Sequence, residues 1–84
     1  MNQYSMLVRL NLSMNKIQSV ESGFDACPNL RSLTMSDNLM LEISPLMFYK
    51  CKSLRHLNLD LNKITKIQNL GTLTDLTELS LQNN

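Results

Sequence analysis

The stretch LRHLNLDLNKI at residues 54–64 contains a frame of apolar residues around one asparagine, LxxLxLxxNxI. The same frame occurs at residues 7–17 and at residues 30–40, where methionine fills two of its apolar places. A fourth copy begins at Leu76 and reaches Asn84, and the four opening leucines are 23, 24 and 22 residues apart. A period of roughly 20–29 residues indicates a solenoid of stacked coils, each with one short strand and one helix or 3₁₀ turn.

The two apolar residues that are separated by one position in each frame indicate a short strand with one buried face. The residues between them are small, polar and uncharged, namely Asn11, Thr34, Asn58 and Ser80. We expect these four side chains to face solvent. The predicted fold class is α/β, a right-handed solenoid with a curved parallel sheet on the concave side and short helices or 3₁₀ turns on the convex side.

An asparagine follows three residues after the last apolar residue of each predicted strand, where the chain turns out of the sheet. A turn leaves backbone groups unpaired, and a buried amide side chain can both donate and accept hydrogen bonds. We therefore predict a structural ladder between coils, made of Asn15, Asn38, Asn62 and Asn84.

The segments between the frames predict the convex side. Residues 22–26, ended by Pro28, indicate a capped helical turn, and Ser44-Pro45 predicts a helix over residues 46–51. Residues 69–73 are shorter and predict a 3₁₀ turn. Two further inward columns are expected at six and three residues before each opening leucine: Phe24, Phe48 and Leu70, then Cys27, Cys51 and Leu73.

The chain starts and stops in phase with the repeat, because Met1 and Tyr4 lie six and three residues before Leu7. We expect one array over residues 1–84, with residues 1–6 as the tail of a preceding coil or a makeshift cap. Full repeats are then residues 7–29, 30–53 and 54–75, and residues 76–84 are a partial repeat. Neither end offers the polar-faced cap that solenoids need, which favours an excerpt of a longer array, with end-to-end self-association as the alternative.

The frame resembles the leucine-rich repeat family over nearly the whole chain. The first two coils look like typical animal-type repeats, with phenylalanine in the convex segment. The third, LRHLNLDLNKITKIQNLGTLTD, is similar to the 22-residue subclass of protein-phosphatase regulators and their intracellular, often ciliary or cytoskeletal, relatives. The resemblance implies a module that holds a protein partner against its concave sheet. It also implies a cytoplasmic location, with a cytoskeletal or ciliary setting as the alternative.

Composition and charge argue against several classes of partner. Eight basic and seven acidic side chains leave a net charge of +1, too small to favour nucleic acid or an anionic membrane. No apolar run approaches the about 18 residues of a membrane span, and the start, MNQYSMLVRL, has no export-signal pattern. Cys27 and Cys51 are expected to be small buried hydrophobes instead of a disulfide or half a metal site, so neither a metal nor a cofactor is predicted.

Candidate partner-binding residues come from the positions between the apolar residues of the frame. Arginines and the single histidine fall near the strand starts, and acidic residues fall near the strand ends and in the last coil. Such a dipolar face would align a partner of matching charge, although the same pattern fits an ordinary solvated sheet. The predicted concave set is Arg9, Asn11, Arg31, Thr34, Asp37, Arg55, His56, Asn58, Asp60 and Glu78.

Apolar residues outside the inward columns suggest further contacts. Met14 and Leu61 directly precede ladder asparagines and are expected at the rim of the sheet. The second coil has more apolar residues than its columns need, so a convex edge is a second candidate surface, with Leu39, Leu41, Leu46 and Tyr49.

No pattern predicts catalysis, because no nucleophile and base converge around His56 and the two glycines form no phosphate-binding loop. The predicted function is a non-enzymatic protein-protein interaction module. Two alternatives stay open. One is the substrate-recruiting segment of a ubiquitin ligase or phosphatase complex with catalysis elsewhere, and the other is part of an extracellular receptor ectodomain.

Overall fold

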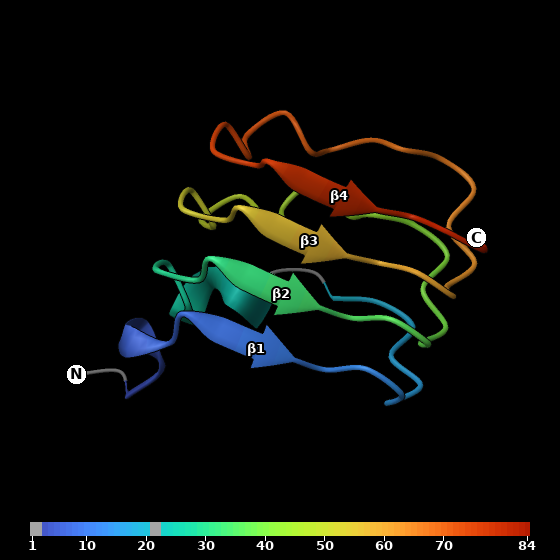
Figure 1. Ribbon diagram of the computed structural model, residues 1–84, viewed down its shortest axis with the longest axis horizontal. Helices are drawn as coiled ribbons and strands as arrows, with labels where there is room; N and C mark the ends of the chain where they lie inside the picture. Colours follow the sequence, from blue (N-terminus) through green and yellow to red (C-terminus); the bar gives the residue numbers. More distant parts are fainter. Residues whose placement is uncertain (1–2, 21–22) are drawn as a thin grey trace.

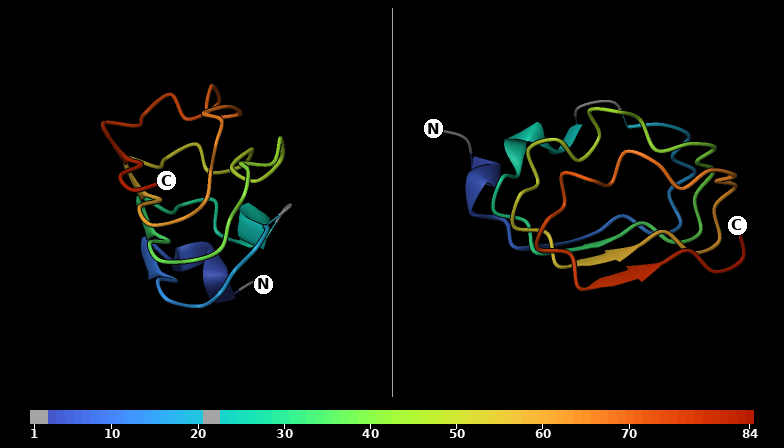
Figure 2. Two further views of the ribbon diagram at one scale, coloured as in Figure 1. Left: turned by 90° about the vertical axis from the view of Figure 1, so that its right-hand side faces the viewer. Right: turned by 90° about the horizontal axis from the view of Figure 1, so that it is seen from above.

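Four short parallel strands form one wall of a right-handed solenoid (Figure 1). The computed structural model describes residues 3–20 and 23–84. The strands are β1 (Arg9–Asn11), β2 (Ser32–Thr34), β3 (His56–Asn58) and β4 (Glu78–Ser80), and they lie in the order β1-β2-β3-β4. Seen along the stack in Figure 2, each coil returns on the far side from the sheet and the next coil lies over it.

The register of the sheet aligns each frame with the next. Leu10 pairs with Leu33, Leu33 with Leu57, and Leu57 with Leu79. Because side chains alternate along a strand, this register turns all four leucines inward and leaves their polar neighbours on the outer face. The predicted fold class is confirmed.

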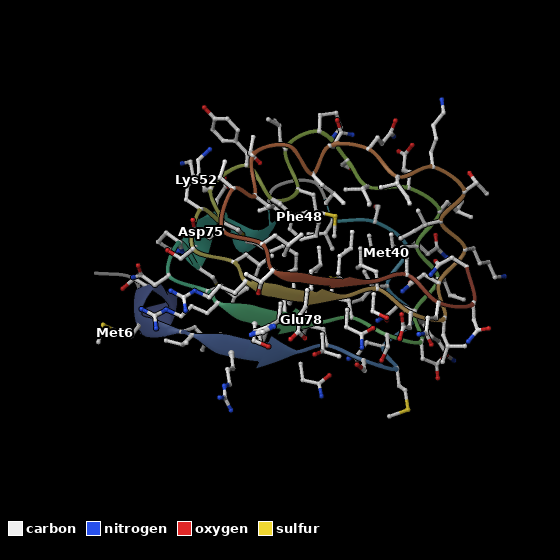
Figure 3. The ribbon with its side chains drawn as sticks, turned by 45° about the horizontal axis from the view of Figure 1, so that its top comes forward. Met6, Met40, Phe48, Lys52, Asp75 and Glu78 are labelled. Atoms are coloured by element: carbon white, nitrogen blue, oxygen red, sulfur yellow. The ribbon has the colours of Figure 1, made fainter. Side chains whose placement is uncertain are left out.

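The interior is filled by the expected columns of apolar side chains. Phe24 and Phe48 are buried and stack with ring centroids 6.0 Å apart. In Figure 3 Met40 and Phe48 lie inside the coils, whereas Glu78 projects from the sheet away from them. Burial depends on position in the stack: Leu33 and Leu57 are 1% and 2% exposed, but Leu79 in the last coil is 40% exposed.

The ladder asparagines connect adjacent coils through both ends of the amide. Asn38 Oδ1 accepts hydrogen bonds from the backbone N–H groups of Asn15 and Ile17, each at 3.0 Å, in the preceding coil. Its Nδ2 donates to the carbonyls of Leu12 and Met35 at 3.0 and 2.9 Å. The pattern repeats in the next coils at Asn62 and Asn84. Asn38 and Asn62 are buried, so their hydrogen bonds take the place of hydrogen bonds to water.

The convex side is less helical than the sequence predicts. The helical turn of the first coil is present as η2 (Gly23–Ala26), after η1 (Gln3–Met6) at the start of the described chain. The helix predicted over residues 46–51 is wrong. Its N–H groups bond only three residues back, as from Met47 to Ser44 and from Cys51 to Phe48, in separate turns. Six residues are too few to offset the cost of nucleating an α-helix.

The third convex segment is closed by a single turn. The Leu73 N–H donates to the Leu70 carbonyl at 3.0 Å, the bonding step of a 3₁₀ turn, and no 3₁₀ helix extends from it. Asn69 has a positive φ of 62° here, and its side chain donates to the Ile43 carbonyl at 2.7 Å. Some predicted columns and caps lie outside the described residues, namely those at Met1, Ser22 and the side chain of Tyr4.

The residue before each ladder asparagine adopts a left-handed backbone. Met14, Asp37, Leu61 and Asn83 have φ values of 60°, 57°, 57° and 59°. This turn presents the N–H groups of the first three to the following coil, where they bond the carbonyls of Ser36, Asp60 and Gln82. The sequence gives no sign of it at Met14 or Leu61, because large apolar residues rarely adopt this conformation.

Cys27 and Cys51 are free and buried, as predicted. Burial, with the nearby Cys27 and Asp25 as smaller contributions, raises the pKa of the Cys51 thiol from 9.0 to about 11. At neutral pH this thiol is therefore protonated, and it acts as a packing group instead of a nucleophile.

Candidate partner-binding face

The outer face of the sheet, here called the concave face, is defined by Arg9, Asn11, Ser32, Thr34, His56, Asn58, Glu78 and Ser80. A hollow of about 620 Å³ lies over its last three strands, lined by β2, β3, β4 and Thr77. Four of the predicted site residues lie in it, namely Thr34, His56, Asn58 and Glu78. The hollow is open and mostly polar, so it presents hydrogen-bonding groups at the surface and does not have the enclosed shape of a small-molecule site.

His56 and Glu78 meet in the hollow because the register places them side by side on β3 and β4. His56 Nδ1 lies 3.3 Å from Glu78 Oε2, and the two side chains are 48% and 75% exposed. A pair this exposed contributes little to folding, so both side chains are available to a partner.

The predicted residues Asn11, Asn58 and Asp60 are partly engaged in the fold. Asn11 Oδ1 accepts from the Ser13 N–H and Asn58 Oδ1 accepts from the Asp60 N–H, each at 2.9 Å, which shapes the turn after the strand. Asp60 Oδ1 accepts from the Ser80 hydroxyl at 2.6 Å and from the Gln82 N–H at 2.8 Å. Asp60 therefore holds the last coil in place through two hydrogen bonds. The sequence pattern did not predict this role.

Most other residues of the predicted set also lie outside the hollow. Arg9 and Asn11 are on β1, at the opposite end of the face. Arg31 and Arg55 come one residue before β2 and β3, at the edge where the strands start. Asp37 lies beyond the end of β2 and is exposed. The structure therefore separates the predicted set into residues in the hollow over β2 to β4, residues on β1, and residues just before or after the strands.

Exposed apolar residues occur where the sequence predicts them. Met14 and Leu61 are 75% and 51% exposed at the strand-end rim. On the convex edge Leu41, Leu46 and Tyr49 are exposed, and Leu39 is half-buried. The Tyr49 ring is covered on one face by Lys52, whose Nζ lies 5.2 Å from the ring centroid.

No group of three or more histidine, cysteine or acidic side chains among residues 3–20 and 23–84 is arranged to hold a metal ion. Within the same residues, no helix is long and apolar enough to cross a membrane.

Comparison with known families matches this architecture. The model described as "Leucine rich repeat" matches residues 28–84, and the model "Leucine Rich repeats (2 copies)" matches residues 5–46. No solved structure matches the chain.

Curated relatives are similar over most of this chain but are much longer. Tsukushi of Xenopus tropicalis is 42% identical over 76 residues, which cover 86% of this chain and 21% of the relative. Leucine-rich repeat-containing protein 66 of Homo sapiens is 35% identical over 85 aligned residues, covering 99% of this chain and 10% of the relative. The chain thus spans about a fifth or less of the curated relatives it matches. With one family model over more than half of its length and the repeat frame in every coil, this chain belongs to the leucine-rich repeat family.

Proposed function

We propose that this chain is a non-enzymatic binding module that holds a partner protein on its concave face. The observation that carries the proposal is the hollow over β2, β3 and β4. Among the described residues, the Thr34 side chain has no hydrogen-bond partner, and His56 and Glu78 form an exposed pair. A fold that needed the His56 and Glu78 side chains internally would have buried them, so their exposure favours a role in recognition.

The experiment is to block the hollow without disturbing the core. Thr34→Arg places a long cation into the hollow from its β2 side, where the half-buried threonine side chain forms no hydrogen bond with the described residues. Thr65→Arg makes the same replacement at an exposed threonine outside the hollow and is the matched control. Both proteins should fold equally well by circular dichroism.

We expect partners captured by the wild-type chain from lysate, and identified by mass spectrometry, to be lost with Thr34→Arg and retained with Thr65→Arg. Purified partner should then bind the wild-type chain at least about tenfold more tightly than Thr34→Arg, as expected when a side chain blocks the centre of an interface. Equal retention by both variants would place binding on another surface and refute the proposal.

We further propose a cytoplasmic location, which the free thiols of Cys27 and Cys51 support because reducing compartments keep cysteines unpaired. Imaging of the tagged full-length protein tests this directly, and a signal confined to the secretory pathway would contradict it.

A further inference from the structure

Arg31 and Arg55 of the predicted set lie at the strand-start edge of the second and third coils, and Arg9 lies on β1 one residue further along, opposite Ser32. The Arg31 N–H donates to the Val8 carbonyl at 2.8 Å, and the Arg55 N–H donates to the Arg31 carbonyl at 2.8 Å. Arg9 directly follows Val8 in the chain, so its backbone lies next to that of Arg31. Neighbouring strands are about 4.8 Å apart, and the three residues, here called the arginine edge, span roughly 10 Å.

The arginine edge is not neutralised within the molecule. All three side chains are exposed, and no carboxylate of the described residues forms an ion pair with any of them. Glu78 is in the next coil, and its N–H bonds the Arg55 carbonyl at 3.0 Å. Its carboxylate turns instead to His56 at 3.3 Å.

Arg31 and Arg55 hold equivalent positions one residue before their strands, and like charges on neighbouring strands repel, so the core gains nothing from this arrangement. A carboxylate bound across two guanidinium groups would remove the repulsion and form bidentate hydrogen bonds, which arginine makes well. We propose that the arginine edge binds a short acidic segment of the partner protein. This inference rests on the proposed function. It adds the charge of the partner segment that docks beside the hollow.

The size of the charged surface argues for a short peptide segment. An extended chain advances about 3.4 Å per residue, so roughly three or four residues cover the 10 Å of the arginine edge. A long polyanion such as nucleic acid would continue across the face toward the exposed Glu78 carboxylate, which repels it. The net charge of only +1 also gives little attraction for a polyanion.

An NMR titration of the 84-residue chain, labelled with ¹⁵N, with a synthetic peptide of four consecutive glutamates tests the proposal. We expect the largest amide shifts at Arg9, Arg31 and Arg55 and a fall in affinity with added salt. Arg31→Glu should weaken binding at least about fivefold, because one attraction becomes a repulsion. Lys66→Glu makes the same change in net charge at an exposed residue of the third coil and should leave the affinity unchanged.

The Arg31→Glu variant also separates binding from folding. Its carboxylate would lie between two arginines, so its melting temperature should equal or exceed that of the wild type. If Arg31→Glu fails to fold, Arg31→Gln provides the same readout without the charge reversal. Shifts centred elsewhere, an equal loss with Lys66→Glu, or arginine-dependent binding of a short DNA duplex but not of the peptide would each overturn the proposal.

The two proposals fail separately. If partner capture is lost with Thr34→Arg but unchanged with Arg31→Glu, binding on the concave face is supported and the proposal of an acidic segment is refuted. If peptide binding depends on Arg31 but partner capture is unchanged with Thr34→Arg, the proposed function is refuted as stated.

Discussion

The side chain of Asn62 accepts a hydrogen bond from the backbone N–H of Met40, at 3.1 Å, although 22 residues separate them in the chain. The same amide donates to the Met35 and Leu59 carbonyls, each at 3.0 Å. One side chain thus satisfies buried backbone groups of two coils, where the sheet no longer does so.

Asn62→Ala should lower the free energy of unfolding by at least about 3 kcal/mol, because it leaves several buried backbone groups unpaired at once. Asn15→Ala is the matched control. Asn15 is exposed and donates only to Leu12 and Ser13 of its own coil, so its loss should cost less than about 1 kcal/mol. Urea denaturation followed by circular dichroism gives both values, and similar losses would contradict a structural role for the ladder.

Leu57→Ala and Leu79→Ala test whether stability depends on position in the stack. The first residue is 2% exposed between two coils and the second is 40% exposed in the last coil. We expect Leu57→Ala to cost about 2–5 kcal/mol and Leu79→Ala less than about 2 kcal/mol. Thermal melting of the two variants under one condition is the measurement. Equal costs would mean that the coils do not contribute separately to stability.

Leu61→Asn should stabilise the chain. Leu61 has a φ of 57° and is 51% exposed, and asparagine adopts this conformation more readily than leucine. The gain should be about 0.5–1 kcal/mol, part of the usual penalty for a left-handed residue. Ile67→Asn replaces an apolar residue that is 70% exposed and has no positive φ, so it should give no gain. A rise in melting temperature in both variants would point to solubility instead of backbone strain.

Alkaline pH should weaken the fold through Cys51. Above pH 9 the unfolded chain loses the thiol proton, whereas the folded chain keeps it until the pKa of about 11 is reached. Stability therefore falls as pH rises through this window, by up to about 3 kcal/mol from this group. The stability advantage of the wild type over Cys51→Ala should shrink between pH 9 and pH 11 in urea titrations, and a constant difference would refute the coupling.

Periodicity alone predicts the sheet, its register and the inward columns, because a fixed repeat forces equivalent residues such as Leu33 and Leu57 to stack. It also places Asn38 and Asn62, since only a side chain that donates and accepts can serve the buried turn. The helix predicted over residues 46–51 was wrong. The capping signals at Ser44 and Pro45 are local, and they do not show that this segment of the coil is too short for an α-helix.

The candidate site is less predictable than the fold. Thr34, His56, Asn58 and Glu78 follow from strand alternation, and the structure places them together in the hollow. The arginines were predicted near the strand starts, but the pattern fixes the strand bounds only to within a residue or two, so it did not show that Arg31 and Arg55 lie just outside β2 and β3. It also did not show the hydrogen bonds of Asp60 to the last coil.

The ladder asparagines bond backward along the stack, so the protection of certain amides in one coil depends on the next coil. The amide hydrogens of Ile17, Met40 and Ile64 are held by side chains one coil further along, those of Asn38, Asn62 and Asn84. When the last coil opens, Ile64 loses its protection against solvent exchange although its own coil is intact. Hydrogen–deuterium exchange at these three amides would therefore read out, coil by coil, the order in which the array loosens.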